Sequence, residues 1–113
     1  MAYIEKPVSI QELYDSKKTG EPSIRALRSR AQEGILVYVR SQGNEHLYDE
    51  TLSVIRARAA RECKRPGVRW KDIKRELPYI SITNDKIKEL LNSGVSEEKI
   101  IQMLRDELNS RLT

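Results

Sequence analysis

Apolar residues recur at helical spacing in six stretches of the chain, and a β-branched and aromatic run lies between the second and the third stretch. Such spacing predicts helices with one apolar face. The run Ile35–Arg40, followed by turn-forming residues and by His46–Tyr48, predicts a two-stranded hairpin. Residues 79–82 are interpreted as a strand or as an extended segment. The expected helices cover residues 10–16, 23–33, 50–63, 68–77, 84–92 and 97–111.

Residues at the ends of these stretches favour helix boundaries. Ser9 and Glu12 have the spacing of a capping box, in which each side chain bonds to the backbone of the other residue. Gly34 is expected to end the second helix, and Asp49 to cap the third. In the second helix, Arg30 is expected part way round towards the exposed face.

A chain of 113 residues is long enough for one domain, or for a small domain with an appendage. The order of elements predicts a mostly helical α+β fold, a small winged helix-turn-helix with a two-stranded wing and a C-terminal helical extension. We expect the winged unit over residues 8–63, a basic connector with a short helix over 64–82, and a helical hairpin over 83–113.

The net charge of +4 is unevenly distributed along the chain. Between Arg56 and Arg75 there are nine basic residues and two acidic ones, and six of the nine are arginines. Arginine makes paired hydrogen bonds to phosphates and base edges, so this segment indicates a nucleic-acid partner and salt-sensitive affinity. The alternative is a solvated surface on which these arginines pair with acids of the same chain. Trp70, within this segment, is expected in the core.

Composition argues against several kinds of chemistry. The one cysteine, Cys63, and the one histidine, His46, are too few for a disulfide framework or the usual zinc site. His46 has no obvious catalytic partner and is interpreted as a packing residue between the wing strands. The sequence contains no phosphate-binding glycine loop and no nucleophile elbow. We therefore expect no catalytic residues, no metal and no cofactor. With no signal peptide or membrane-spanning run, we expect a cytoplasmic protein that does not contact a membrane.

Three pieces of sequence give residues 8–60 a resemblance to a known family. They are Val8–Leu13, the pair of segments Ser23–Arg28 and Glu33–Leu36, and Gly43–Asp49. In this order they resemble the winged helix-turn-helix proteins that include MerR-type regulators, phage excisionases and the small subunits of lambda-type phage terminases. The last piece is most similar to the terminase subunits.

The resemblance implies that the second helix enters the major groove of DNA and that the wing lies over an adjacent minor groove. It implies contacts from the following residues: Lys17 and Lys18 near the DNA backbone; Ser23, Arg25, Arg28 and Ser29 on the second helix; Arg40, Gln42 and Asn44 on the wing. The basic segment adds Arg56, Lys64, Arg65, Arg69 and Lys71 as expected phosphate contacts.

The C-terminal hairpin presents acidic residues that would repel phosphates, so we expect it to bind a protein. Its apolar stripe must pack on the wing unit, on a second copy or on another protein. We expect this stripe to form the interface with a protein partner, or with further copies of the chain in a homodimer or higher oligomer. Its residues are Ile87, Leu91, Ile101, Leu104 and Leu108.

The sequence thus predicts a non-catalytic, sequence-selective double-stranded DNA-binding protein, such as a transcription regulator or an excisionase-like factor. One alternative is a packaging factor similar to the terminase small subunits, which marks viral DNA. Another is a protein–protein adaptor or inhibitor built on the same fold. RNA binding is disfavoured, because RNP-like motifs and aromatic clusters are missing.

Overall fold

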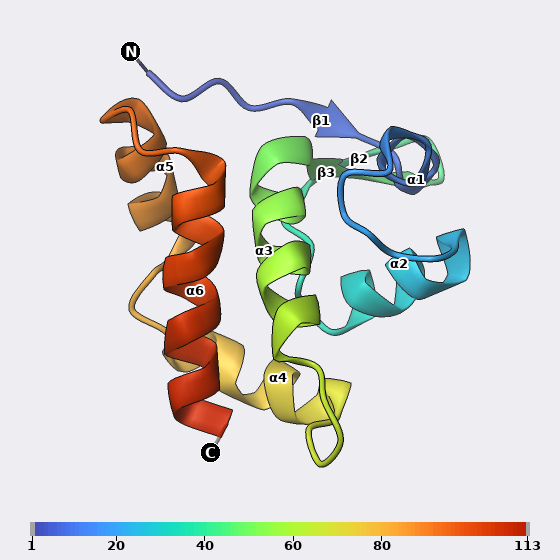
Figure 1. The fold of residues 1–113 in the computed structure, drawn as a ribbon. Helices are drawn as coiled ribbons and strands as arrows, with labels where there is room; N and C mark the ends of the chain where they lie inside the picture. Colours follow the sequence, from blue (N-terminus) through green and yellow to red (C-terminus); the bar gives the residue numbers. More distant parts are fainter. Residues whose placement is uncertain (1, 113) are drawn as a thin grey trace.

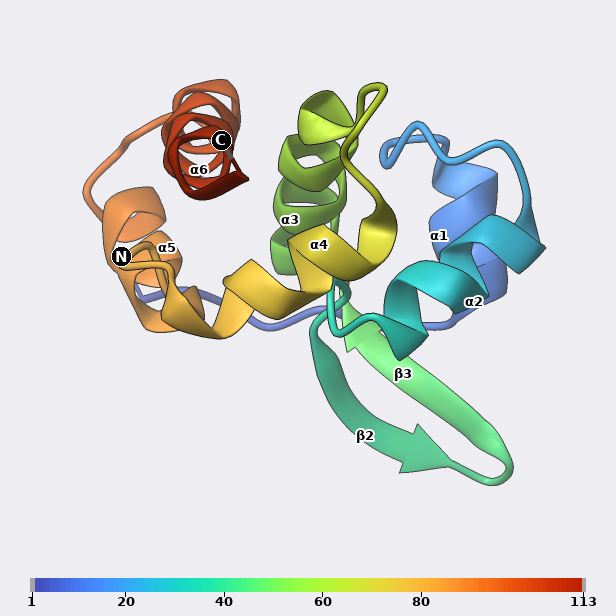
Figure 2. The same ribbon diagram turned by 90° about the horizontal axis from the view of Figure 1, so that it is seen from below.

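The central helix of the structure is α3 (Glu50–Cys63), which lies between the N-terminal and the C-terminal helices (Figures 1 and 2). The computed structural model describes residues 2–112. On one side of α3 are α1 (Ile10–Ser16) and α2 (Ile24–Gln32), and on the other side α6 (Glu97–Leu112) runs along it. This arrangement confirms the expected small, mostly helical α+β fold.

Three further elements link α3 to α6. They are α4 (Trp70–Glu76), the 3-10 turn η1 (Leu77–Tyr79) and α5 (Asn84–Asn92). Residues 80–83 connect η1 to α5 without forming a strand, and Tyr79 belongs to η1 while residues 81 and 82 form a bend. The segment 79–82 is therefore neither a strand nor a continuous extended stretch, contrary to both expectations. No helix within residues 2–112 is long and apolar enough to cross a lipid bilayer.

A small antiparallel sheet carries the wing. Its strands are β1 (Pro7–Val8), β2 (Tyr38–Gln42) and β3 (Glu45–Asp49), in the order β1-β3-β2. The β2–β3 hairpin projects from the body of the protein (Figure 2). The sequence pattern did not predict β1, because a strand of two residues is too short to show an alternation of apolar and polar positions.

The first strand of the hairpin starts three residues later than predicted. Ile35 and Leu36 are buried and contribute to the core instead of the sheet. The Val37 amide donates to the Ser53 hydroxyl at 2.9 Å, and the Val37 carbonyl accepts from the Asp49 amide at 2.8 Å. The first half of the run Ile35–Arg40 therefore anchors the wing to α3 and does not form part of the hairpin.

The helix boundaries largely follow the predicted caps. Both hydrogen bonds of the Ser9–Glu12 capping box are present. Asp49 caps α3 by accepting from the Leu52 amide at 3.1 Å, and Gly34 follows α2 with a φ of +74°. That φ is in the left-handed region, which glycine adopts without a steric penalty.

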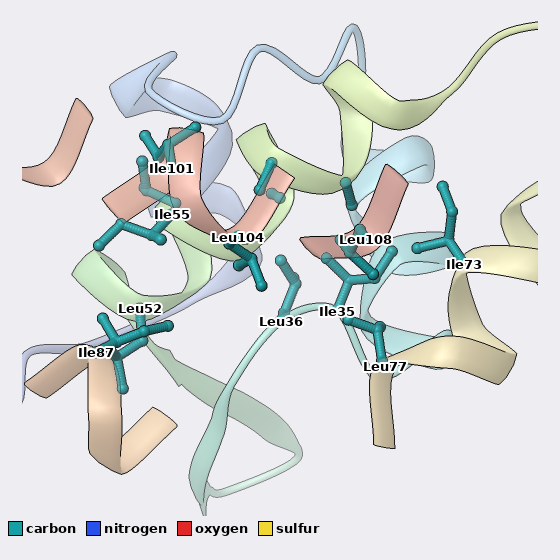
Figure 3. Packing of buried hydrophobic residues seen from close by; sticks show 14 of the residues in the cluster. Ile35, Leu36, Leu52, Ile55, Ile73, Leu77, Ile87, Ile101, Leu104 and Leu108 are labelled. Atoms are coloured by element: carbon teal, nitrogen blue, oxygen red, sulfur yellow. The ribbon is translucent and has the colours of Figure 1, made fainter. Parts of the chain in front are cut away.

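A single hydrophobic core joins all three segments expected from the sequence. It contains Leu13 and Leu27 from the first segment. It also contains Ile73 from the second segment, and Ile87 and Leu104 from the third, which Figure 3 shows. The apolar stripe of the C-terminal helices packs on the rest of the chain, which was one of the three alternatives left open for it.

This packing corrects the expected partner surface. The residues Ile87, Ile101, Leu104 and Leu108 are at most 1% exposed, so they are not accessible to another protein in this fold. Leu91 is partly buried against the same core. An exposed stripe for dimerisation is therefore not formed by these residues.

We expect Leu104→Ala to lower the free energy of unfolding by about 2–5 kcal/mol, because it leaves a cavity in this shared core. Ile4→Ala, at a position that is 81% exposed, is the control and should change it by less than about 0.5 kcal/mol. Urea unfolding followed by far-UV circular dichroism and by Trp70 fluorescence measures both. Separate transitions for the two signals would contradict a single cooperative core.

Candidate nucleic-acid interface

Three arginines project from α2 and the wing without any side-chain partner among the described residues. Arg25, Arg28 and Arg40 are exposed, and their side chains make no hydrogen bond or ion pair within residues 2–112. Arg25 and Arg28 are three residues apart on α2, so they lie on the same face of that helix. These two are the central residues of the predicted interface.

The other nine of the twelve arginines are all engaged within the chain. Their partners are carboxylates, backbone carbonyls or side-chain amides. The nine are Arg30, Arg56, Arg58, Arg61, Arg65, Arg69, Arg75, Arg105 and Arg111. Most of the basic segment from Arg56 to Arg75 thus follows the alternative that its arginines pair locally.

Arg56 is a structural residue and not an exposed phosphate contact. Its guanidinium donates to the carbonyls of Ile35 and Gly34, both at 2.8 Å, and to the Asn84 side chain at 3.4 Å. Burial lowers the pKa of Arg56 below its ordinary value. The side chain fastens the end of α2 and the start of the wing to α3, which differs from the predicted DNA contact.

Arg30 is also turned inward, contrary to its expected position towards the exposed face. Its guanidinium carbon lies 3.3 Å from the centre of the Trp70 ring, and its Nε is 2.7 Å from a carboxylate oxygen of Glu33. Glu21, buried nearby, pairs with Arg61 at 3.1 Å. Burial raises the pKa of Glu33, and the charge of Arg30 offsets that effect only in part. The stack on Trp70, which packs against the core as expected, holds α2 to α4.

The predicted contacts in the basic connector fall into two groups. Arg65 bonds to the Cys63 carbonyl and to Asn109, and Arg69 pairs with Asp72. The side chains of Lys64 and Lys71 are exposed and have no hydrogen bond or ion pair within the described part of the chain. Only the two lysines are therefore free to meet a phosphate without breaking an existing contact.

The predicted residues near the first helices are similarly divided. Lys17 is exposed and its side chain has no partner within residues 2–112, whereas the Lys18 ammonium is 3.1 Å from Glu50. The Ser23 hydroxyl caps α2 by accepting from the Ala26 amide, and the Ser29 hydroxyl donates to the Arg25 carbonyl. The two serines thus make local hydrogen bonds and are secondary candidates for DNA contacts.

The two faces of the wing differ in chemistry. Tyr38, Ser41 and His46 form a chain of hydrogen bonds, with the Tyr38 hydroxyl 2.9 Å from Ser41 Oγ, which is 3.0 Å from His46 Nδ1. His46 is exposed, but its ring packs edge-on against that of Tyr38 across the two wing strands, which agrees with the packing role expected from the sequence. Arg40 is opposite Leu47 in the register, and it therefore lies on the other face of the hairpin from His46.

A groove of about 730 Å³ separates α1 and α2 from the wing. Apolar residues of the two helices and Tyr48 line part of it. Its polar lining comprises Gln11, Arg28, Gln32, Asn44, Glu45 and His46. Asn44 was predicted in the wing turn, and Gln42 is exposed beside it, opposite Glu45. The groove thus brings a predicted arginine of α2 and the predicted wing turn to one surface.

Four polar residues of the groove were missed by sequence reasoning: Gln11, Gln32, Glu45 and His46. Gln32 follows Arg28 by four residues and therefore shares its helix face, a signal that was available in the sequence. The role of His46 depends on which face of β3 is turned towards α2, and one sequence does not fix that choice.

No group of three His, Cys, Asp or Glu side chains within residues 2–112 could hold a metal ion. Cys63 is buried, and burial raises the pKa of its thiol to about 11, so the unreactive thiol form prevails at neutral pH. Comparison with protein-family models, curated proteins and solved structures gave no match.

We expect Arg56→Met to lower the free energy of unfolding by about 2–3 kcal/mol, because two backbone carbonyls lose a charged donor. Lys64→Met is the matched control, since the Lys64 side chain is exposed and has no partner among the described residues, and it should change stability by less than about 0.5 kcal/mol. Urea unfolding measures both. Equal losses in the two variants would contradict the structural role of Arg56.

Glu50 gives stability a dependence on pH. Burial alone would raise the pKa of Glu50. The hydrogen bond and charge of Lys18 and the charge of Lys6 lower it by more than burial raises it, so the pKa falls below its ordinary value of 4.5. The stabilisation that the ionised Glu50 carboxylate gives to the folded state is therefore complete above about pH 4.5. It is lost as the pH falls through the lowered pKa.

Glu50→Gln should thus cost about 1 kcal/mol of unfolding free energy at pH 7, and less at pH 3. Urea unfolding of the wild type and the variant at the two pH values tests this, with exposed Glu5→Gln as the control. A difference between wild type and Glu50→Gln that is as large at pH 3 as at pH 7 would contradict the assignment.

Proposed function

We propose that the chain is a non-catalytic double-stranded DNA-binding protein, in which α2 enters the major groove and the β2–β3 wing lies over the adjacent minor groove. The observation that supports this proposal is the distribution of arginine partners. Arg25, Arg28 and Arg40 have none within residues 2–112, whereas the other arginines are paired inside the chain.

Unpaired guanidinium groups suit this role for a physical reason. An arginine already bound to a carboxylate must give up that contact before it binds phosphate, while a free one loses only solvent. Arginine on a helix in the major groove can also make paired hydrogen bonds to guanine, which gives sequence selectivity. The proposed role is that of a transcription regulator or an excisionase-like factor acting in the cytoplasm.

A packaging factor is the second candidate. The run Gly43–Asp49, which resembles the wing end of terminase small subunits, forms the turn and return strand of the wing and leads directly into α3. Both candidates require DNA binding by the same surface, so the first experiment tests what they share.

We expect Arg25→Ala and Arg28→Ala each to weaken binding to a selected duplex by about tenfold or more, because each base-edge or phosphate contact is worth about 1–3 kcal/mol. Arg58→Ala is the control, since Arg58 pairs with Glu98 at 2.6 Å on another part of the surface. The duplex is selected from a random pool by the wild type, and fluorescence anisotropy at two salt concentrations measures the affinities.

The affinity of the wild type for DNA should fall as the salt concentration rises. A variant that loses one phosphate contact should show a slope of log affinity against log salt concentration that is smaller by about one. An adaptor or inhibitor would show no DNA binding. Absent or salt-independent binding, or an equal loss with Arg58→Ala, would overturn the proposal.

A further inference from the structure

Hydrogen-bond donors without partners converge on the groove between α2 and the wing. Arg28 and Gln32 line it from α2, and Asn44 and His46 line it from the wing. Within residues 2–112, the side chains of Arg28, Gln32 and Asn44 make no hydrogen bond or ion pair, and His46 is bonded only through Nδ1. A surface that collects free donors from two separate elements is complementary to an anion.

The hydrogen-bond chain on the wing orients the His46 ring. Ser41 Oγ lies 3.0 Å from Nδ1 and is itself held by the Tyr38 hydroxyl, while the Tyr38 ring packs edge-on against the imidazole. When the Ser41 hydroxyl donates to Nδ1, the proton of the neutral ring is on Nε2, which is then a donor. Nε2 has no partner within the described residues.

We infer that this groove binds the sugar-phosphate strand that separates the major from the minor groove, with Arg28 and His46 as phosphate donors on its two walls. The inference rests on the proposed function, because a helix in the major groove and a wing over the neighbouring minor groove have one strand between them. It assigns a DNA contact to His46 and to the wing face opposite Arg40.

Among the described residues, Glu45 is the only acidic one that lines the groove. It is exposed and has no ion pair within residues 2–112. A carboxylate beside a bound phosphate opposes binding, so removal of its charge strengthens binding. A purely structural role for the groove gives no such increase, which makes the sign of this effect diagnostic.

The test measures binding of the full chain to a labelled random-sequence duplex of about 25 base pairs by fluorescence anisotropy at low salt, since phosphate contacts do not depend on sequence. His46→Ala should weaken binding by about tenfold, as expected for loss of a hydrogen bond to a charged group, and His46→Gln should restore part of it because the amide is a donor. Glu45→Gln should tighten binding by about threefold at low salt.

Glu5→Gln is the matched control, because it removes the same charge from an exposed position outside the groove, and it should have a smaller effect than Glu45→Gln. Wild-type binding with no change in either His46→Ala or Glu45→Gln would overturn the groove assignment and leave the proposed function intact. Failure of the wild type to bind any duplex would instead refute the proposed function, and this inference with it.

Discussion

The burial of α3 is the constraint on which the rest of the structure depends. Leu52 and Ile55 face the core, and the small side chains of Ala57, Ala59 and Ala60 are completely buried as well. A helix with buried positions on nearly every side has to be covered on every side, and small residues allow its neighbours to approach closely. The helices α1 and α2 supply one cover and α6 supplies the other (Figure 2).

This burial also determines which positive charges remain available. Arg56, Arg58 and Arg61 are on a helix with little free surface, so each is drawn into a contact with a neighbouring element: the end of α2, Glu98 of α6 and Glu21 before α2. Such contacts fix the positions of those elements relative to α3. The helix face of Arg25 and Arg28 and the projecting wing are outside this network, and their arginines are left for an external anion.

The local parts of the fold were readable from the sequence, because they depend on neighbouring residues. The Ser9–Glu12 capping box, the Asp49 cap and the glycine after α2 each require only a few residues in order. What could not be predicted depends on long-range packing. The pairing of β1 with β3, the inward turn of Arg30 onto Trp70 and the covering of the C-terminal stripe by α3 all join distant parts of the chain. For the same reason the sequence showed the basic segment but not the partners of its arginines.

Arginine side-chain NMR of the full chain, titrated with the selected duplex, tests most directly whether DNA is bound by the unpaired arginines of α2 and the wing and not by the paired ones. The claim predicts large changes in the Nε–Hε signals of Arg25, Arg28 and Arg40, and small changes for Arg56, Arg58 and Arg61, which keep their intramolecular partners. Large changes confined to the paired arginines of α3, or to Arg105 and Arg111 on α6, would contradict it.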